Sequence, residues 1–582
     1  MTSNPVTGPP IDLLPPGTTA TVTGSGATAR VLWEHLTALG VTTVDGGLQP
    51  ATDIAASVSL EVGDGARREL VVHWSGPLQA VELTDETAVQ AICGVMHVNG
   101  RSTGSPRGLA PDYCATAAGV VAMTGLLASL LVPARRLRVQ TSVAEAALLA
   151  ISQYLAAAGA DDPEAVSLDP GGPPFVSADG IRFEIESLQP EPWAAFWTAL
   201  DADPAALRKG WRPFQFRYAT ATAPLPEPLH RAARSHTFAT ITDIGNRSGV
   251  SVCRLYGSHD HAAPDPALPT APWTVADIPD NTPSRASSPA GTGIRFEGPS
   301  DDVPTGGQAG DRADRPLAGI RVLEAGRRVQ APLAAHLLRL LGADVTRIEP
   351  PGGDPLRDMP PCSGDLSARW LALNRHKSAR EFDIKSPEDR SRLRELATEY
   401  DVFLHNWAPG KAEQLGLSGA GLPPGIIYIH TSGWAGADLT DLPPGTDFMV
   451  QARTGLAELV GPPDTPAAPS LMTILDVLGG VLGAEAAIIG LLRRRAVGGG
   501  VAVESSLLSA SNILRRHACA GMPAGTRQPF RMDGQWVVTD ASGGTAHVTT
   551  DLTELLDDPR FATVIGRDDH GCPALAMPWR LS

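Results

Sequence analysis

The chain has 582 residues, of which 47 are Lys or Arg and 63 are Asp or Glu, so its formal net charge is −16. The length predicts several domains, and the excess of acidic residues argues against a nucleic-acid-binding surface. The six cysteines are scattered without a Cys-x-x-Cys pair, which favours reduced thiols in a cytoplasmic protein over a disulfide framework or a zinc site.

The N-terminal part of the chain predicts neither a signal peptide nor a membrane anchor. Residues 1–22 are rich in Pro, Thr and Gly and are expected to form a flexible arm, without the basic and apolar regions of a signal peptide. Residues 114–134 are uncharged and long enough to span a bilayer. Their many Ala, Gly, Ser and Thr residues, and the lack of flanking aromatic residues, favour a buried helix of a soluble protein.

The first half of the chain, residues 23–262, alternates predicted helices and strands. Apolar residues at helical spacing predict an amphipathic helix over residues 31–40, which ends at a glycine. A small domain with more aromatic residues is expected at about 171–255, after a Gly-Gly-Pro-Pro turn. A His-Asp-His run at 259–261 has no third ligand in view, so we predict no metal site there.

Residues 263–315 are rich in Pro, Ser, Asp and Gly and are predicted to be a linker. The second half, residues 316–582, opens with a predicted strand at 320–324, a helix at 332–341 and a strand at 343–349. This order and spacing predict a right-handed parallel crossover. Ligands of such sheets bind beyond the carboxyl ends of the strands.

A strongly apolar stretch of the second half carries the candidate catalytic residue. Asp476 stands at the start of an apolar run that continues to Leu492, and arginines and glycines follow it. This pattern predicts a capped and almost fully buried helix. On the pattern alone, Asp476 is most simply the N-cap of that helix.

The two halves share a spacing that predicts a tandem duplication. Asp112 lies 27 residues before Val139, as Asp476 lies 27 residues before Val503, and a serine follows 30 residues beyond each aspartate. Such matched intervals predict a duplicated domain. The first copy is shorter and lacks several strands, so we expect it to be degenerate and interpret Asp112 as a helix cap.

Motifs of the second half resemble those of the family III CoA-transferases, the CaiB/BaiF family that contains formyl-CoA transferase, carnitine CoA-transferase and α-methylacyl-CoA racemase. The resemblance covers about residues 316–520, and the motifs follow one another in the family's order. They are PLAGIRVLE at 316–324, LGADVTRIEPPGGDP at 341–355, LNRHK at 373–377, NWAPG at 406–410 and the Asp476 stretch.

The resemblance implies a fold and a mechanism. The fold is α/β, with two halves that each contain a Rossmann-like parallel sheet and a small α/β domain. The halves would form an intramolecular pseudo-dimer in a monomer or a homodimer, with the active site between the large domain of one half and the small domain of the other. Asp476 stands at the position of the family's nucleophile, which forms a mixed anhydride and then an aspartyl-CoA thioester. An acceptor acid then takes over the CoA.

The same matching implies a set of residues that contact CoA. They are Gln330, Ala331, Phe382, Asn406, Trp407, Gly433 and Trp434. Gly479 and Gly480 would let the thioester approach closely, and backbone N–H groups at the helix start would stabilise the oxyanion. Pro350, Gln414 and Ser432 replace basic residues of some family members, which suggests weaker CoA binding or a different acyl carrier.

The expected function is that of an acyl-CoA:carboxylate CoA-transferase, with coenzyme A thioesters and a carboxylic acid as substrates and with no metal, nucleic acid or membrane partner. One alternative is a non-catalytic acyl-CoA-binding pseudoenzyme or scaffold, which the degenerate first half and the missing cations favour. Another is racemase or dehydratase-like activity. Racemisation is disfavoured because Thr446 stands where the racemases hold a histidine base.

Overall fold

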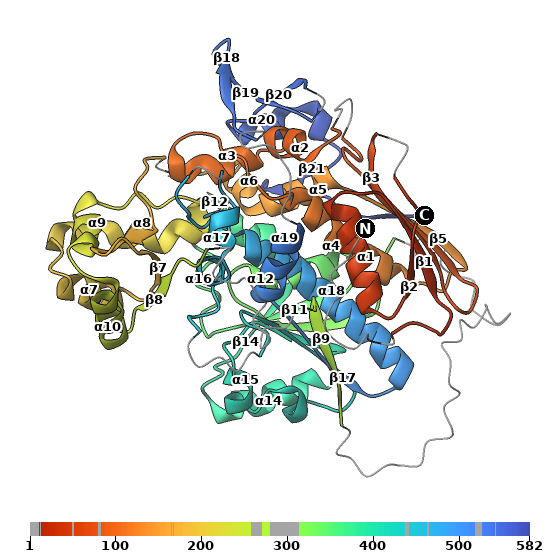
Figure 1. The fold of residues 1–582 in the computed structure, drawn as a ribbon. Helices are drawn as coiled ribbons and strands as arrows, with labels where there is room; N and C mark the ends of the chain where they lie inside the picture. The colour runs from red at the N-terminus through yellow and green to blue at the C-terminus, as the bar shows by residue number, and fades with distance from the viewer. Residues whose placement is uncertain are drawn as a thin grey trace.

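A four-layer arrangement of two sheets and two long helices forms the framework of the molecule (Figure 1). The computed structural model describes residues 11, 13–48, 52–78, 83–164, 166, 168–257, 271–279, 314–436, 442–462, 465–517, 527–541 and 543–582. Helix α4 (Tyr113–Ser129) packs on the sheet of the first half, and α18 (Ile474–Val497) packs on the sheet of the second half. The two helices also contact each other, so the halves share one continuous core.

The sheet of the second half is Rossmann-like, with the strand order β14-β11-β10-β15-β16-β17-β9. Its first six strands are parallel, as predicted, and β9 joins the edge antiparallel to β17. The strands are β14 (Ser378–Glu381), β11 (Asp344–Glu349), β10 (Arg321–Ala325), β15 (Val402–His405), β16 (Ile427–Ser432), β17 (Gly500–Ser506) and β9 (Trp273–Ile278). Helices α12 (Gln330–Leu340) and α18 cover one face, and α14 (Pro387–Ala397) and α15 (Lys411–Leu415) cover the other.

Strand β9 corrects the prediction that residues 263–315 are a linker throughout. Its residues pair with all of β17 except Ser506, from Gly500 opposite Ile278 to Ser505 opposite Trp273. The Trp273 side chain is buried. The pairing stabilises a segment whose composition suggested a loop, because β17 would otherwise present an open edge.

The sheet of the first half differs from the expected parallel sheet because it is mixed. Its strand order is β2-β1-β3-β4-β5-β23, and only the β1–β2 and β4–β5 pairs are parallel. Strands β3 and β4 are joined by a five-residue connection, and such a hairpin can only pair antiparallel. The strands are β1 (Thr19–Thr23), β2 (Thr42–Asp45), β3 (Ile54–Glu61), β4 (Arg67–His73), β5 (Arg136–Ser142) and β23 (Arg580–Leu581).

The interface between the halves is built on α4 and α18. The Tyr113 hydroxyl of α4 donates to the Ile474 carbonyl of α18 at 3.1 Å. His35, on α1 (Ala27–Ala38), contacts Glu485 of α18 at 2.9 Å, and both side chains are fully buried. Helix α18 is apolar and long enough to cross a membrane, yet its most apolar stretch lies entirely inside the protein. Helix α4 is likewise buried along its whole length, as predicted.

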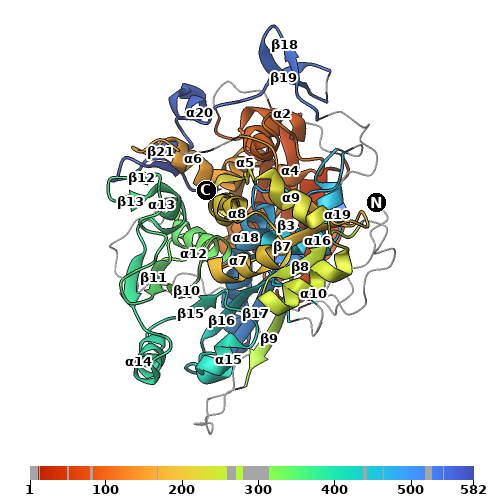
Figure 2. The same ribbon diagram turned by 90° about the vertical axis from the view of Figure 1, so that its left-hand side faces the viewer.

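A small domain projects from the first half, at the left of Figure 1 and toward the viewer in Figure 2, and packs against the second half. An aromatic core that includes Trp193 and Trp197 supports it. Its contacts with the second half include a hydrogen bond from the Tyr256 N–H to the Ala452 carbonyl at 2.9 Å. Its elements are β6 (Phe175–Val176), β7 (Arg182–Glu186), α7 (Pro190–Ala199), α8 (Pro204–Thr220), α9 (Glu227–Arg234), α10 (Phe238–Ser248) and β8 (Ser251–Arg254).

The C-terminal segment leaves the second half and packs on the first half. Its strand β23 pairs with β5, and the indole N–H of Trp579 donates to the Val121 carbonyl of α4 at 2.7 Å. The segment also contains β18 (Phe530–Met532), β19 (Gln535–Thr539), β20 (Thr545–His547), α20 (Thr553–Asp557), β21 (Ile565–Arg567) and β22 (Pro573–Leu575). The small domain of the first half therefore packs on the second half, and the C-terminal segment of the second half packs on the first.

Candidate active site

The start of α18 carries Asp476, the predicted nucleophile. The helix begins at Ile474, and Thr473 before it has a left-handed conformation with φ 54° and ψ 44°. Asp476 is therefore the third residue of the helix. The interpretation of Asp476 as the N-cap is wrong, because Thr473 occupies that position and Asp476 lies within the first turn.

The carboxylate of Asp447 caps the helix instead. Asp447 begins α16 (Asp447–Arg453), and its Oδ2 accepts hydrogen bonds from the backbone N–H groups of Leu475 and Asp476 at 2.8 and 2.7 Å. Its Oδ1 accepts from Nε2 of Gln451 at 2.5 Å. We expected backbone N–H groups of this helix start to stabilise a substrate oxyanion, and two of them are thus already bound. In return, the side chain of Asp476 is left without a capping role.

Electrostatic surroundings keep Asp476 protonated to a higher pH than a carboxyl group in water. Burial raises its pKa well above the usual value, the charge of Asp447 raises it further, Arg328 lowers it, and Glu186 raises it. Burial also raises the pKa of Asp447 to about 6. Two neighbouring carboxyl groups in low dielectric resist simultaneous ionisation.

We expect Asp476→Asn to stabilise the protein at alkaline pH. The folded-state pKa of Asp476 lies above the unfolded value of about 3.9, so the stability that its proton contributes is complete below that value and is lost as the pH rises through the raised pKa. Asparagine carries no charge, so the free energy of unfolding of the variant minus that of the wild type should grow with pH and then level off. Urea unfolding between pH 5 and 8.5 measures this difference. Asp243→Asn, which removes a carboxylate from an exposed ion pair, is the reference substitution against which the difference is compared; a pH-independent gain for Asp476→Asn would contradict the expectation.

Residues of the small domain reach this site. Glu186, at the end of β7, accepts hydrogen bonds from the Thr446 hydroxyl at 2.8 Å and from the Tyr218 hydroxyl. The Tyr218 ring stacks on Phe448, with 4.5 Å between the ring centroids. Thr446 and Phe448 flank Asp447 in the chain, so the small domain of the first half contacts the residues that cap α18 in the second half.

A loop of the second half adds a positive charge. Arg328 lies between β10 and α12, has a φ of 65°, and is exposed. Its guanidinium carbon lies 5.2 Å from the centroid of the Tyr218 ring. We did not predict Arg328, Glu186 or Tyr218 from the sequence. For Arg328 a usable signal existed, since it follows a parallel strand at the edge where ligands bind.

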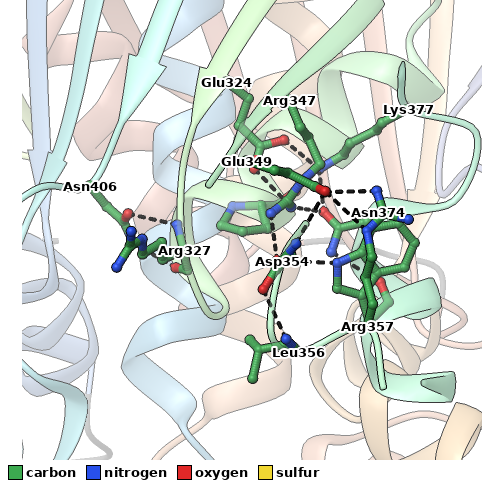
Figure 3. A network of polar contacts seen from close by, with 12 residues as sticks. Glu324, Arg327, Arg347, Glu349, Asp354, Leu356, Arg357, Asn374, Lys377 and Asn406 are labelled. Atoms are coloured by element: carbon green, nitrogen blue, oxygen red, sulfur yellow. Dashed lines mark hydrogen bonds and ion pairs between the residues drawn. The ribbon is translucent and has the colours of Figure 1, made fainter. Parts of the chain in front are cut away.

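Asn406, one of the predicted CoA contacts, holds this loop in place. Its Oδ1 accepts from the Arg327 N–H at 3.0 Å, and its Nδ2 donates to the Arg327 carbonyl at 2.9 Å (Figure 3). The side chain therefore bridges the loops after β15 and β10. In this structure, Asn406 fixes the Arg327 backbone, next to Arg328 of the candidate active site.

The predicted contacts Gln330 and Ala331 are buried where α12 begins. Ala331 is fully buried, and the Gln330 side-chain amide donates to the Ser432 carbonyl at 3.3 Å. A Cβ atom on Gly479 would lie 2.9 Å from this amide, and one on Gly480 would lie 2.9 Å from the Gln330 carbonyl. We expected these glycines to admit a thioester. The structure corrects this expectation, because residues of α12 fill the space beside both glycines.

The other predicted CoA contacts are distributed along the carboxyl edge of the sheet. Phe382 is buried, and Trp407 is half-buried beside His405 with ring centroids 5.0 Å apart. Trp434 is buried and donates its indole N–H to the Pro443 carbonyl at 2.7 Å. Gly433 is needed for packing, since an added Cβ would lie 2.3 Å from the Cα of Gly445. All of these CoA assignments stay predictions.

Three of the family-like motifs meet in one buried polar network (Figure 3). Arg347 contacts Glu324 at 3.2 Å and Asp354 at 2.8 Å. Lys377 donates to Glu324 at 2.8 Å, and burial lowers the pKa of its amine to about 8 although Glu324 raises it. These motifs thus stabilise the neighbouring strands β10 and β11 and the end of α13 (Ala368–Asn374). Here their charges pair with one another.

The corresponding helix start of the first half has no nucleophile. Glu86, on α2 (Glu86–Ile92), accepts from the N–H groups of Cys114 and Ala115 at 2.9 and 2.8 Å, just as Asp447 accepts from those of Leu475 and Asp476. By this comparison, Ala115 of the first half is equivalent to Asp476 of the second, and Asp112 is equivalent to Thr473. The equal 27-residue spacings therefore did not align equivalent residues, because α18 is longer than α4 and the turn after it is shorter.

Asp112 occupies the N-cap position of α4, in line with its interpretation as a helix cap, but its side chain makes no capping hydrogen bond and belongs to an internal ion pair. The Arg527 guanidinium contacts its carboxylate and donates to the carbonyls of Leu109 and Ala110. Burial raises the pKa of Glu86 beside it to about 7, while Arg527 lowers it. The first-half site is thus filled by an arginine of the C-terminal segment.

The described part of the chain contains no group of three or more His, Cys, Asp and Glu side chains arranged to hold a metal ion. The His-Asp-His run at 259–261 lies outside the described residues.

Comparison with known proteins shows the family. The model of CoA-transferase family III matches residues 74–299 and again 317–567. A human succinyl-CoA:glutarate CoA-transferase is 28% identical over 273 residues, which cover 43% of this chain and 62% of the relative. A succinyl-CoA–D-citramalate CoA-transferase from Chloroflexus aurantiacus is 30% identical over 286 residues, covering 44% and 71%. The crystal structure of a CAIB/BAIF family protein from Brucella suis is 26% identical with a TM-score of 0.34, covering 43% of this chain and 73% of that one.

The matches thus span less than two thirds of the human relative's length. Two successive matches to one family model accord with the duplication that the sequence predicted. On these matches, the chain belongs to CoA-transferase family III, with two copies of the family's domain in tandem.

Proposed function

We propose that this protein is an acyl-CoA:carboxylate CoA-transferase that works through covalent intermediates on Asp476. The observation that carries the proposal is the position of Asp476, whose helix start is capped by Asp447 and whose carboxyl group lies among charged residues of both halves. The relatives are named as enzymes that transfer CoA between carboxylic acids, which supports the reaction class.

The proposed reaction proceeds in two symmetrical halves. The Asp476 carboxylate attacks the thioester carbon of acyl-CoA, the C–S bond breaks, and a mixed anhydride and CoA thiolate result. The thiolate attacks the Asp476 carbonyl of the anhydride and releases the donor acid, which leaves an aspartyl-CoA thioester. An acceptor carboxylate repeats the sequence in reverse and departs as the new acyl-CoA. No external base is needed, because a carboxylate is itself the nucleophile.

The working site in this proposal is shared between the halves of one chain. The second half provides Asp476, Asp447 and Arg328, and the small domain of the first half provides Glu186 and Tyr218. The first half offers Ala115 at the position of the nucleophile, so a pseudo-dimer with a single active site follows. Racemisation is disfavoured because the Thr446 hydroxyl donates to Glu186 where a histidine base would be needed.

Chemical trapping tests the proposal directly. Incubation with succinyl-CoA followed by hydroxylamine or borohydride should modify Asp476, as identified by peptide mass spectrometry. Labelling should rise with pH, because only the ionised carboxylate attacks and its pKa is raised. Tight binding of succinyl-CoA, shown by calorimetric titration, without any labelling or exchange over a panel of acids would instead favour the non-catalytic scaffold.

A further inference from the structure

The loop between β10 and α12 presents an exposed arginine at a site made mostly of carboxyl groups. Arg328 is exposed, while Ala325 and Val329 on either side of the turn are buried. Its φ of 65° is uncommon for a residue with a side chain. Such conformations cluster at functional sites, where surrounding contacts hold them.

Contacts on both sides of Arg328 fix the loop. Asn406 binds both the N–H and the carbonyl of Arg327. On the other side, the Gln330 side chain donates to the Ser432 carbonyl and packs against Gly479, three residues beyond Asp476. These contacts therefore fix the position of the Arg328 backbone relative to the start of α18.

The charge balance of the site leaves Arg328 available for a ligand. Asp447 is bound by the helix start, and Glu186 pairs with the buried Arg217 at 3.3 Å. Arg328 forms no ion pair with any residue that the structure describes, and its guanidinium lies near the Tyr218 ring. An exposed guanidinium offers parallel N–H donors that match a carboxylate.

We propose that Arg328 binds the carboxylate of the acid substrate and positions it for attack on the aspartyl-CoA thioester. This inference rests on the proposed function. The bound acid uses one carboxylate oxygen to attack the Asp476 carbonyl, the C–S bond breaks, and CoA thiolate leaves. In the first half of the cycle, the same guanidinium holds the donor acid as it departs. The acid and the CoA moiety therefore depend on different residues.

Steady-state kinetics of Arg328→Gln test this role, with succinyl-CoA as donor and the best acceptor from a panel of acetate, oxalate, succinate and glutarate. We expect the KM for the acid to rise about 10–100-fold, as loss of a charge-assisted contact implies. The Kd for CoA, measured by calorimetry, should stay within about twofold, which a purely structural defect would not leave intact. Arg328→Lys keeps the charge but not the planar fork, so its KM for the acid should lie between those of the wild type and Arg328→Gln.

A matched control removes the same charge from the same loop. Arg327→Gln changes an exposed neighbour, and its KM for the acid should remain near the wild-type value. If Asp476 is trapped normally in Arg328→Gln and the KM for the acid is unchanged, the role of Arg328 is refuted while the proposed function stands. If Asp476 of the wild type is never trapped, the proposed function itself fails. If Arg328→Gln does not fold, Arg328→Lys decides, with an unchanged KM counting against the proposal.

Discussion

Asp476→Ala should lower the rate of CoA transfer at least about 10⁴-fold, as loss of a covalent nucleophile does in other enzymes. Neither neighbouring carboxylate can replace it. Asp447 is fully buried and bound to two backbone N–H groups, and Glu186 accepts from Thr446 and Tyr218. The measurement is kcat for transfer from succinyl-CoA, together with the Kd for CoA, which should change little.

The matched control for this experiment is Asp112→Ala. Asp112, in the first half, forms an ion pair with Arg527 of the C-terminal segment. It is structurally equivalent to Thr473 rather than to Asp476. Per folded molecule, its kcat should stay within a few-fold of the wild-type value. Full activity of Asp476→Ala, or a large loss for Asp112→Ala alone, would overturn the assignment of one nucleophile to one half.

Residues 316–582 expressed alone should be insoluble or inactive. The fragment lacks Glu186 and Tyr218 at the site, and it exposes the buried face of α18 that α4 covers. Its C-terminal segment also loses β5, the partner of β23. Exposed apolar surface of this extent promotes aggregation. Solubility, sedimentation and turnover of the fragment measure the effect.

Co-expression with the first half refines this test. Residues 1–279 should restore activity better than residues 1–262, because only the longer piece supplies β9 to the edge of β17. The comparison separates the contribution of β9 from that of the small domain. A soluble and fully active monomer of residues 316–582 would show that the first half is dispensable.

The strongest local patterns were sufficient to predict the core of the second half. The expected strand, helix and strand at 320–349 correspond to β10, α12 and β11, because long apolar runs of clear periodicity leave few alternatives. The buried helix after Asp476 was predicted for the same reason. The family resemblance then supplied the catalytic role, which no periodicity contains.

Features that depend on distant contacts could not be predicted in this way. Nothing local to Trp273 shows that a strand of the neighbouring half is open for pairing. The capping of α18 by Asp447 joins residues 28 and 29 positions apart. Equal spacings in sequence suggested that Asp112 matches Asp476. The capping hydrogen bonds instead make Ala115 the equivalent of Asp476, because the longer helix and the shorter turn of the second half leave a net difference of three residues.

The pairing of β23 with β5 has a consequence for the order of events during protein synthesis. About 440 residues separate the two strands, which at 5–20 residues per second means a delay of about 20–90 s on the ribosome. During that time, the edge of β5 and the groove at Gly125 of α4, where Trp579 docks, have no partner. The first half therefore lacks this partner until residues 579–581 have been synthesised, and a nascent chain that stalls before them leaves an open strand edge for chaperones to protect.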